Sequence, residues 1–271
     1  MNGASREALA AARERLDTLT DSTSVDAVTL ADELAAVTAL LDREAGLRRV
    51  VTDPAQSGEA KAELVQRLLG AQVSGTAADL VAGMARARWS QPRDLVDALE
   101  ELADIADLTA AEKRGTLDEV EDELFRFGRI VSSSTELRAA LTDRSADGRA
   151  KTELLHRLLG GRAKPATERL VVRLVTAPRG RSLEAGLESL SKLAAERRDR
   201  VVAVVTSAVP LSDTQKQRLG AALGKLYGRR MHLNLDVDPD VVGGMRVQVG
   251  DEVINGSLAD RLDEAARRMA S

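Results

Sequence analysis

Apolar residues recur every three or four positions through the first two hundred residues of the chain. Two stretches illustrate the spacing: Leu30, Leu34, Val37 and Leu41, then Val120, Leu124, Phe127 and Val131. This is the period of one face of an α-helix, so the region is predicted to be helical. Pro165 fits the first turn of a further helix, and Ser134 and Glu136 belong to a capping box that opens another.

After Arg200 the pattern changes and predicts strands. The run 201–205 is wholly apolar, as in a buried strand, whereas 231–237 and 245–249 alternate apolar with polar residues. A return strand at 253–254 and helices over about 213–227 and 258–269 give the order β–α–β–β–β–α. The predicted fold class is therefore α+β. It is mostly α-helical, with tandem helical-bundle repeats followed by a small C-terminal α/β sheet domain.

Three glycine-containing pairs make the last thirty residues the most distinctive part of the chain. The pairs are Gly243-Gly244, Gly250-Asp251 and Gly256-Ser257. A phosphate-binding loop would need a Lys followed by Ser or Thr in GxxxxGK[ST], and the chain has no such motif. We interpret the glycines as backbone around a β-hairpin, followed by a helix that Asn255 and its neighbours begin.

The chain repeats itself at an offset of 90 residues. Residues 47–70 align with 137–160, and 13 of these 24 positions are identical. The matches include polar and apolar positions alike, and Gly70 and Gly160 both stand where a helix C-cap is expected. This agreement indicates a duplicated helical unit.

The segment 93–109 resembles both ends of that unit. Its leucines match the closing stretch 183–190, while Ala98-Leu99 matches Ala8-Leu9 in the opening stretch. We expect one helix here to end the first bundle and begin the second. The predicted domains are 1–92, an extra helical copy; 93–198, a helical bundle; and 199–271, the α/β domain. The charged run 196–200 is interpreted as a solvated helix end and hinge.

Composition narrows the classes of function. Apolar residues make up 44% of the 271 residues but aromatic residues only 1%, so the core must consist of Leu, Val and Ala, which suits helix bundles. The 39 basic and 43 acidic residues leave a net charge of −4, which argues against a nucleic-acid partner. The absence of cysteine excludes thiolate metal sites and cysteine nucleophiles.

Metal, cofactor and catalytic sites have little support in the sequence. His156 and His232 lie too far apart for a histidine metal pair, and Asp122-Glu123 is expected on an exposed helix face, so no metal, cofactor or catalytic residue is predicted.

Trp89 is expected to pack against other side chains, partly buried. The N-terminal residues lack the apolar stretch of a signal peptide, and no apolar run approaches the ~18 residues of a membrane span.

About two-thirds of the chain, residues 93–271, resembles the delta subunit of bacterial rotary ATP synthases, which is related to the mitochondrial oligomycin-sensitivity-conferring protein. The resemblance rests on 117–124, 137–143, 151–160, 204–212 and, above all, the spacing of the C-terminal glycine pairs. Two departures stand out. Asn255 replaces an Asp that the family often has, and the first 92 residues exceed the usual length, an extension associated with actinobacterial members.

The resemblance implies a non-catalytic stator subunit on the cytoplasmic face of the cell membrane, attached only through its complex. It would link the catalytic head to the peripheral stalk and resist rotor torque. In the family an N-terminal helix of an alpha subunit binds between the first and fifth helices of the bundle, about 95–109 and 166–178 here. The implied groove residues are Leu99, Leu102, Ile105, Leu170, Leu174 and Val175. Leu258 and Leu262 would meet the b-type stalk subunit.

Two other functions remain open from the residues alone. The helical repeats suit an adaptor that binds an amphipathic helix of some other partner. An enzyme built on the small α/β domain would need polar groups near strand ends, where only Asp236, Asp238 and Asp240 are available. The sequence also leaves open which helical copy binds the alpha-subunit helix.

Overall fold

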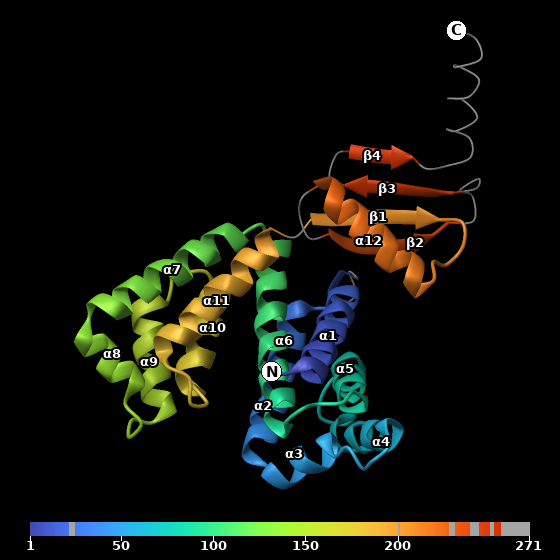
Figure 1. Cartoon of the computed structure of the whole chain (residues 1–271). Helices are drawn as coiled ribbons and strands as arrows, with labels where there is room; N and C mark the ends of the chain where they lie inside the picture. The colour runs from blue at the N-terminus through green and yellow to red at the C-terminus, as the bar shows by residue number, and fades with distance from the viewer. Residues whose placement is uncertain (22–24, 200, 228–230, 239–243, 250–251, 256–271) are drawn as a thin grey trace, which may run out of the picture. The chain divides into compact units, whose positions relative to one another are not determined.

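The computed structural model describes residues 1–21, 25–199, 201–227, 231–238, 244–249 and 252–255 (Figure 1). It forms two compact units, Met1–Arg198 and Asp199–Ser271. The first is helical and the second contains the sheet, so the predicted α+β fold class is confirmed. The first unit spans both helical copies. The predicted domain boundary between the copies at residue 92 stays a prediction.

The helical unit is a duplication at the level of its elements. The first copy begins with α1 (Gly3–Asp21), and the remaining helices are α2 (Ala27–Arg43), α3 (Ala45–Thr52), α4 (Gly58–Leu69), α5 (Gly75–Arg86), α6 (Pro92–Lys113), α7 (Leu117–Ser133), α8 (Thr135–Thr142), α9 (Gly148–Leu159), α10 (Pro165–Thr176) and α11 (Leu183–Arg198). Each helix from α2 to α5 begins and ends 90 residues before its counterpart from α7 to α10. The offset of the sequence repeat is therefore also the offset of the helices.

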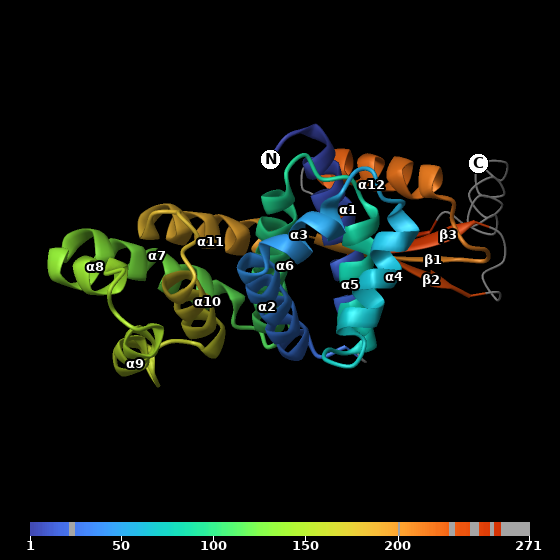
Figure 2. The ribbon, with the colours of Figure 1, turned by 90° about the horizontal axis from the view of Figure 1, so that it is seen from below.

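The helix α6 belongs to both copies. Its residues Leu95, Leu99 and Leu102 lie in the apolar core of the first copy, whereas Leu108 and Ala111 lie in the core of the second. It stands between the two groups of helices in Figures 1 and 2 and contacts α1, α2, α10 and α11. Nearly every residue from Asp94 to Ala111 is consequently buried.

Local signals in the sequence explain where several helices begin. The Ser134 side chain caps α8 by accepting from the Leu137 backbone N–H, and Pro165 occupies the first turn of α10. Both copies also hold the start of their fifth helix with a carboxylate from the second. Glu33 accepts from the backbone N–H of Ser74 at 2.7 Å, and Glu123 from that of Lys164 at 2.9 Å.

The sheet unit consists of β1 (Val201–Ser207), α12 (Asp213–Tyr227), β2 (Met231–Val237), β3 (Met245–Val249) and β4 (Glu252–Asn255). The strand order is β2-β1-β3-β4, with β1 parallel to β2 and antiparallel to β3. Ala203 and Val205 of the central strand are fully buried, and α12 packs Leu223 against this core. Ser212 and Gln215 form a capping box before α12.

Some predicted features lie outside the described residues. These are the Gly250-Asp251 turn and the terminal helix with Leu258 and Leu262. Among the helices that the structure describes, none has the length and apolarity needed to cross a membrane.

Candidate partner-binding surfaces

The six residues predicted to line the alpha-subunit groove are buried in the chain by itself. Their exposed fractions are 0% for Leu99, Leu102 and Leu170, 3% for Val175, 5% for Leu174 and 9% for Ile105. The three from α6 lie in the first core and the three from α10 in the second. The structure therefore does not bring the six together on one open face, and their role in binding a partner stays a prediction.

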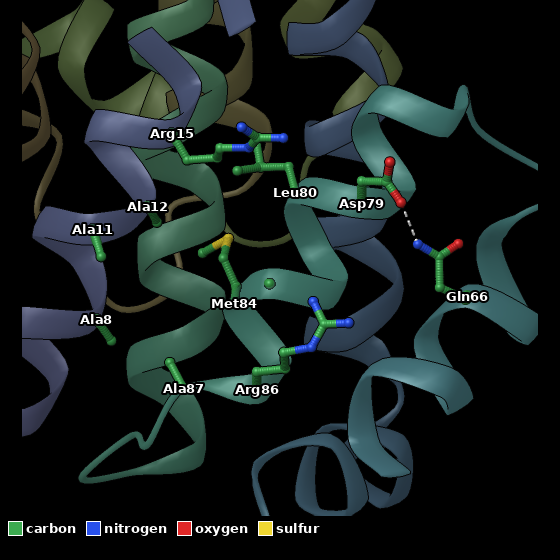
Figure 3. Close-up of a pocket in the computed structure, with 11 residues that line it drawn as sticks. Ala8, Ala11, Ala12, Arg15, Gln66, Asp79, Leu80, Met84, Arg86 and Ala87 are labelled. Atoms are coloured by element: carbon green, nitrogen blue, oxygen red, sulfur yellow. Dashed lines mark hydrogen bonds between the residues drawn. The ribbon is translucent and has the colours of Figure 1, made fainter. Parts of the chain in front are cut away.

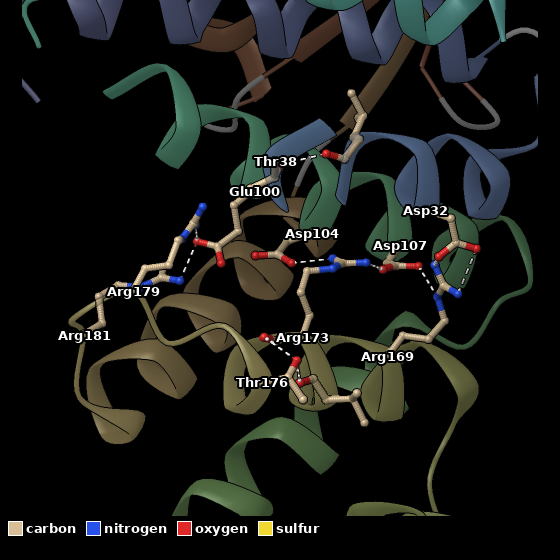
Figure 4. A network of polar contacts seen from close by, with 12 residues as sticks. Asp32, Thr38, Glu100, Asp104, Asp107, Arg169, Arg173, Thr176, Arg179 and Arg181 are labelled. Atoms are coloured by element: carbon tan, nitrogen blue, oxygen red, sulfur yellow. Dashed lines mark hydrogen bonds and ion pairs between the residues drawn. The ribbon is translucent and has the colours of Figure 1, made fainter. Parts of the chain in front are cut away.

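Charged side chains bridge the face between α6 and α10 (Figure 4). The Arg173 guanidinium donates to Asp104 Oδ1 and to Asp107 Oδ2, both at 2.6 Å. Arg169 donates to Asp107 at 2.7 Å and to Asp32 on α2 at 2.6 Å. Because α2 belongs to the first copy and α10 to the second, the Arg169–Asp32 contact joins the copies directly. We call Asp32, Asp104, Asp107, Arg169 and Arg173 the junction network.

A second ionic contact continues along α6. Glu100 is 4% exposed and pairs with both Arg179 and Arg181, which lie in the loop between α10 and α11. Arg179 has a φ of 46°, in the left-handed region that a non-glycine residue adopts at a cost of about 1–2 kcal/mol. Its side chain is buried against Glu100, so this contact holds the strained backbone in place.

Burial changes the acidity of one member of the junction network. It raises the pKa of the Asp104 carboxyl to about 7, with the positive charge of Arg173 acting in the opposite direction and Glu100 and Asp107 adding to the rise. Arg173 has its pKa raised above the ordinary value by the two aspartates, despite its own burial. Paired charges thus occupy part of the α6–α10 face, and Asp104 is the member with a pKa near neutral pH. A cavity of about 240 Å³ lies beside them, lined by Asp104, Leu170 and Leu174 among others.

The corresponding face of the first copy lies between α1 and α5 and is open (Figure 3). A groove of about 440 Å³ is present there, lined by Ala8, Ala11, Ala12, Gly83, Met84 and Ala87, among others. Gly83 occupies the position that Arg173 occupies 90 residues later, and Asp79 the position of Arg169. The first copy therefore lacks both arginines that bridge this face in the second copy.

Most of the residues predicted in the C-terminal glycine block lie outside the described part of the chain: Gly243, Gly250, Asp251, Gly256, Ser257, Leu258 and Leu262. Gly244 is described, and it is an exposed bend residue with a φ of 108°. That positive φ gives a physical reason for glycine before β3. Asp236 is exposed, Asp240 is outside the described residues, and no acidic or histidine cluster within the described ranges is suited to a metal ion.

Two expectations about individual charged residues were wrong. Arg197 is not a solvated end of α11, since it is 7% exposed and donates at 2.6 Å to both Glu112 on α6 and Asp17 on α1. Of the pair expected on an exposed helix face, Asp122 is exposed, but Glu123 is half-buried and holds the start of α10. His156 does lie on the surface, against Glu168, and Trp89 is buried and donates to the Met84 carbonyl at 2.8 Å. The sequence did not reveal the role of Arg197 because its two partners lie 85 and 180 residues away along the chain.

Comparison with known proteins gives the family. The model of the ATP synthase delta (OSCP) subunit family matches residues 105–269. The protein named ATP synthase subunit delta from Streptomyces coelicolor is 82% identical over 100% of this chain and 99% of its own length. The chain belongs to the ATP synthase delta (OSCP) family. A delta subunit of Streptomyces avermitilis is 80% identical over 100% and 99% of the two lengths.

Membership confirms the resemblance inferred from the C-terminal block and makes the chain a delta/OSCP subunit of an ATP synthase. The family match begins within α6, so the first copy lies outside it. The Streptomyces delta proteins nevertheless match over that copy too, which makes the extension a feature they share. A chain of the Toxoplasma gondii mitochondrial ATP synthase hexamer is 23% identical over 62% of this chain and 97% of its own length, with a TM-score of 0.26, too low to support an argument.

Proposed function

We propose that this delta-family chain is a non-catalytic stator subunit that ties the catalytic head of the ATP synthase to its peripheral stalk. The observation that carries the proposal is the membership of the whole chain in the delta family. The arrangement of the helical unit supports it, because Arg–Asp contacts connect α10 both to the shared helix α6 and to α2 of the first copy. A part that resists torque needs such cross-links between its elements more than it needs a reactive site.

The proposed partners are an amphipathic N-terminal helix of an alpha subunit, received by the helical unit, and the b-type stalk subunit, contacted by the C-terminal region. The helix would bind through apolar anchors one helical turn apart. For the family's own bundle, the positions concerned are on α6 and α10, including Leu99, Leu102 and Leu170. The subunit would be held at the cytoplasmic face of the membrane by the complex alone.

The test is reconstitution of proton pumping. Membranes that hold the ATP synthase are stripped of this subunit and of the catalytic head, and the purified head is then added back with or without the full chain. We expect ATP-driven proton pumping only when the chain is present, with an unchanged ATPase rate for the soluble head. Pumping that returns without the chain, or ATP hydrolysis by the chain alone, would contradict the proposal.

A further inference from the structure

The helices α4 and α9 have nearly the same exposed surface, unlike the other helices of the two copies. At the 90-residue offset, five positions are exposed in both α4 and α9, and four of these five carry the same residue. Five positions are exposed in α2, four in α3 and four in α5, and among all of these only Asp32 has the same residue in the second copy. The agreement on the surface is therefore specific to α4 and α9.

Packing within each copy does not account for this agreement. Four positions of α4 are buried, and two of them differ between the copies, since Ala62 corresponds to Thr152 and Val65 to Leu155. Exposed positions usually accept substitution at little cost in stability, whereas buried positions do not. A surface that stays the same while its core changes indicates a contact with something outside the copy.

The shared residues form one stripe along each helix. They are Ala60, Glu63, Leu64, Arg67 and Leu68 in α4, and Ala150, Glu153, Leu154, Arg157 and Leu158 in α9, which we call the α4 stripe and the α9 stripe. Spacings of three and four residues place each set on a single helix face. Leu68 is 40% exposed and Leu158 is 36% exposed. Each stripe thus has an apolar column with a Glu and an Arg beside it.

The charges of the stripes indicate the kind of partner. Within the described ranges, Glu63, Arg67, Glu153 and Arg157 form no ion pair with another residue. Arg157 donates to the backbone carbonyl of Glu153 in its own helix. An apolar column flanked by charges of both signs suits a second helix with an apolar face and the opposite arrangement of charges. Because α4 and α9 lie on opposite sides of α6 in Figures 1 and 2, two partner helices would be needed to occupy both stripes.

We propose that the α4 and α9 stripes are two equivalent docking surfaces, each of which binds one copy of the same amphipathic helix of the catalytic head. The inference rests on the proposed function, in which the helical unit binds the head. Two like surfaces require a segment that the head presents at least twice. Its apolar face would cover Leu68 or Leu158, and its carboxylates would pair with Arg67 or Arg157. These surfaces are separate from the six predicted groove residues, which lie on α6 and α10.

Binding of the labelled full chain to the purified catalytic head, freed of this subunit, tests the two surfaces. Leu68→Lys and Leu158→Lys place a charge in each apolar column, at exposed positions near a helix C-terminus where lysine is well tolerated. Val50→Lys is the matched control, because Val50 is 46% exposed but corresponds to Ala140 in the second copy. We expect each leucine variant to weaken binding about tenfold and the double variant roughly a hundredfold, with Val50→Lys unchanged.

A second pair of variants keeps the test decisive if a leucine variant misfolds. Arg67→Gln and Arg157→Gln retain good helix formers, and each should weaken binding about fivefold. Circular dichroism and the urea midpoint establish that each variant is folded. Head binding at the wild-type level by both double variants, or weakening by the variants of one copy alone, would overturn the two-surface inference and leave the proposed function standing. Failure of the wild-type chain to bind the head would overturn the proposed function as well.

Discussion

At the scale of single residues, Asp104 and Arg173 connect α10 to α6, the helix that both copies share. Arg173 places one guanidinium between two buried carboxylates, and Asp107 is only 1% exposed. Removing one partner of such a buried pair is far more damaging than replacing both, because the remaining charge stays in the interior without compensation. The contact between α6 and α10 therefore depends on the protonation of its members.

The raised pKa of Asp104 predicts a pH dependence of stability with a definite sign. Its ordinary value is 3.8 and its value in the folded chain is about 7. Between these values the folded state binds more protons than the unfolded state, so the contribution of Asp104 is fully present below pH 3.8 and is lost as the pH rises through 7. From pH 6 to pH 8 the free energy of unfolding should fall by about 1.4 kcal/mol more in the wild type than in Asp104→Asn.

Urea unfolding at pH 6, 7 and 8 measures that difference. The comparison with Asp104→Asn removes the contributions of the histidines and other groups that titrate in both proteins. Parallel pH profiles for the two proteins would show that Asp104 does not titrate in this range.

At the scale of the elements, two glycines of the helical unit differ in whether their surroundings leave room for a side chain. Gly83 lies within α5 beside open space, so a Cβ there meets nothing within 4 Å. Gly160 ends α9 with a negative φ of −56°, yet a Cβ on it would lie 2.4 Å from the His156 carbonyl oxygen. Close approach, rather than a left-handed backbone, is what requires glycine at that helix end.

Alanine substitutions should therefore change stability in opposite directions. Gly83→Ala is expected to raise the free energy of unfolding by about 0.5–1 kcal/mol through lower entropy of the unfolded chain. Gly160→Ala is expected to lower it by about 1–3 kcal/mol, because the backbone must shift to admit the methyl group. Urea melts of the two variants give both signs, and shifts in the same direction would contradict this account of the two sites.

The elements themselves followed closely from the sequence. Alternation placed β2 and β3 at their observed bounds, and the helix expected over about 213–227 is α12. The junction network could not be predicted in this way, because Arg173 and its partners lie 66 and 69 residues apart in sequence. The open groove did leave a signal, since the alignment at 90 residues pairs Gly83 with Arg173. The difference between Gly83 and Arg173 can be interpreted only when the structure shows that both positions face the first helix of their copy.

At the scale of the whole molecule, the shared helix α6 makes the two helical copies depend on each other. A fragment 93–198 would keep α6 but lose the helices that cover Leu95, Leu99 and Leu102, which are at most 1% exposed in the full chain. Exposed apolar surface of this kind favours self-association. The fragment 1–198 retains both cores and the ion pair of Arg197 with Asp17.

We expect 1–198 to be a monomer that unfolds cooperatively, and 93–198 to self-associate or to unfold at a lower urea concentration. Size-exclusion chromatography with light scattering, followed by urea titration of the helical circular dichroism signal, distinguishes them. A monomeric 93–198 fragment as stable as 1–198 would show that the second copy is an independent domain after all.

The shared helix also bears on how such a chain can grow. A first copy needs six helices, α1 to α6, but the second adds only five, α7 to α11, because its opening helix already exists. A joint of this kind repeats without a linker, so the spacing between successive units is fixed by one rigid helix rather than by loop length. The length of the helical unit would then change in equal steps of about 90 residues, and a longer unit would need another copy rather than a new fold.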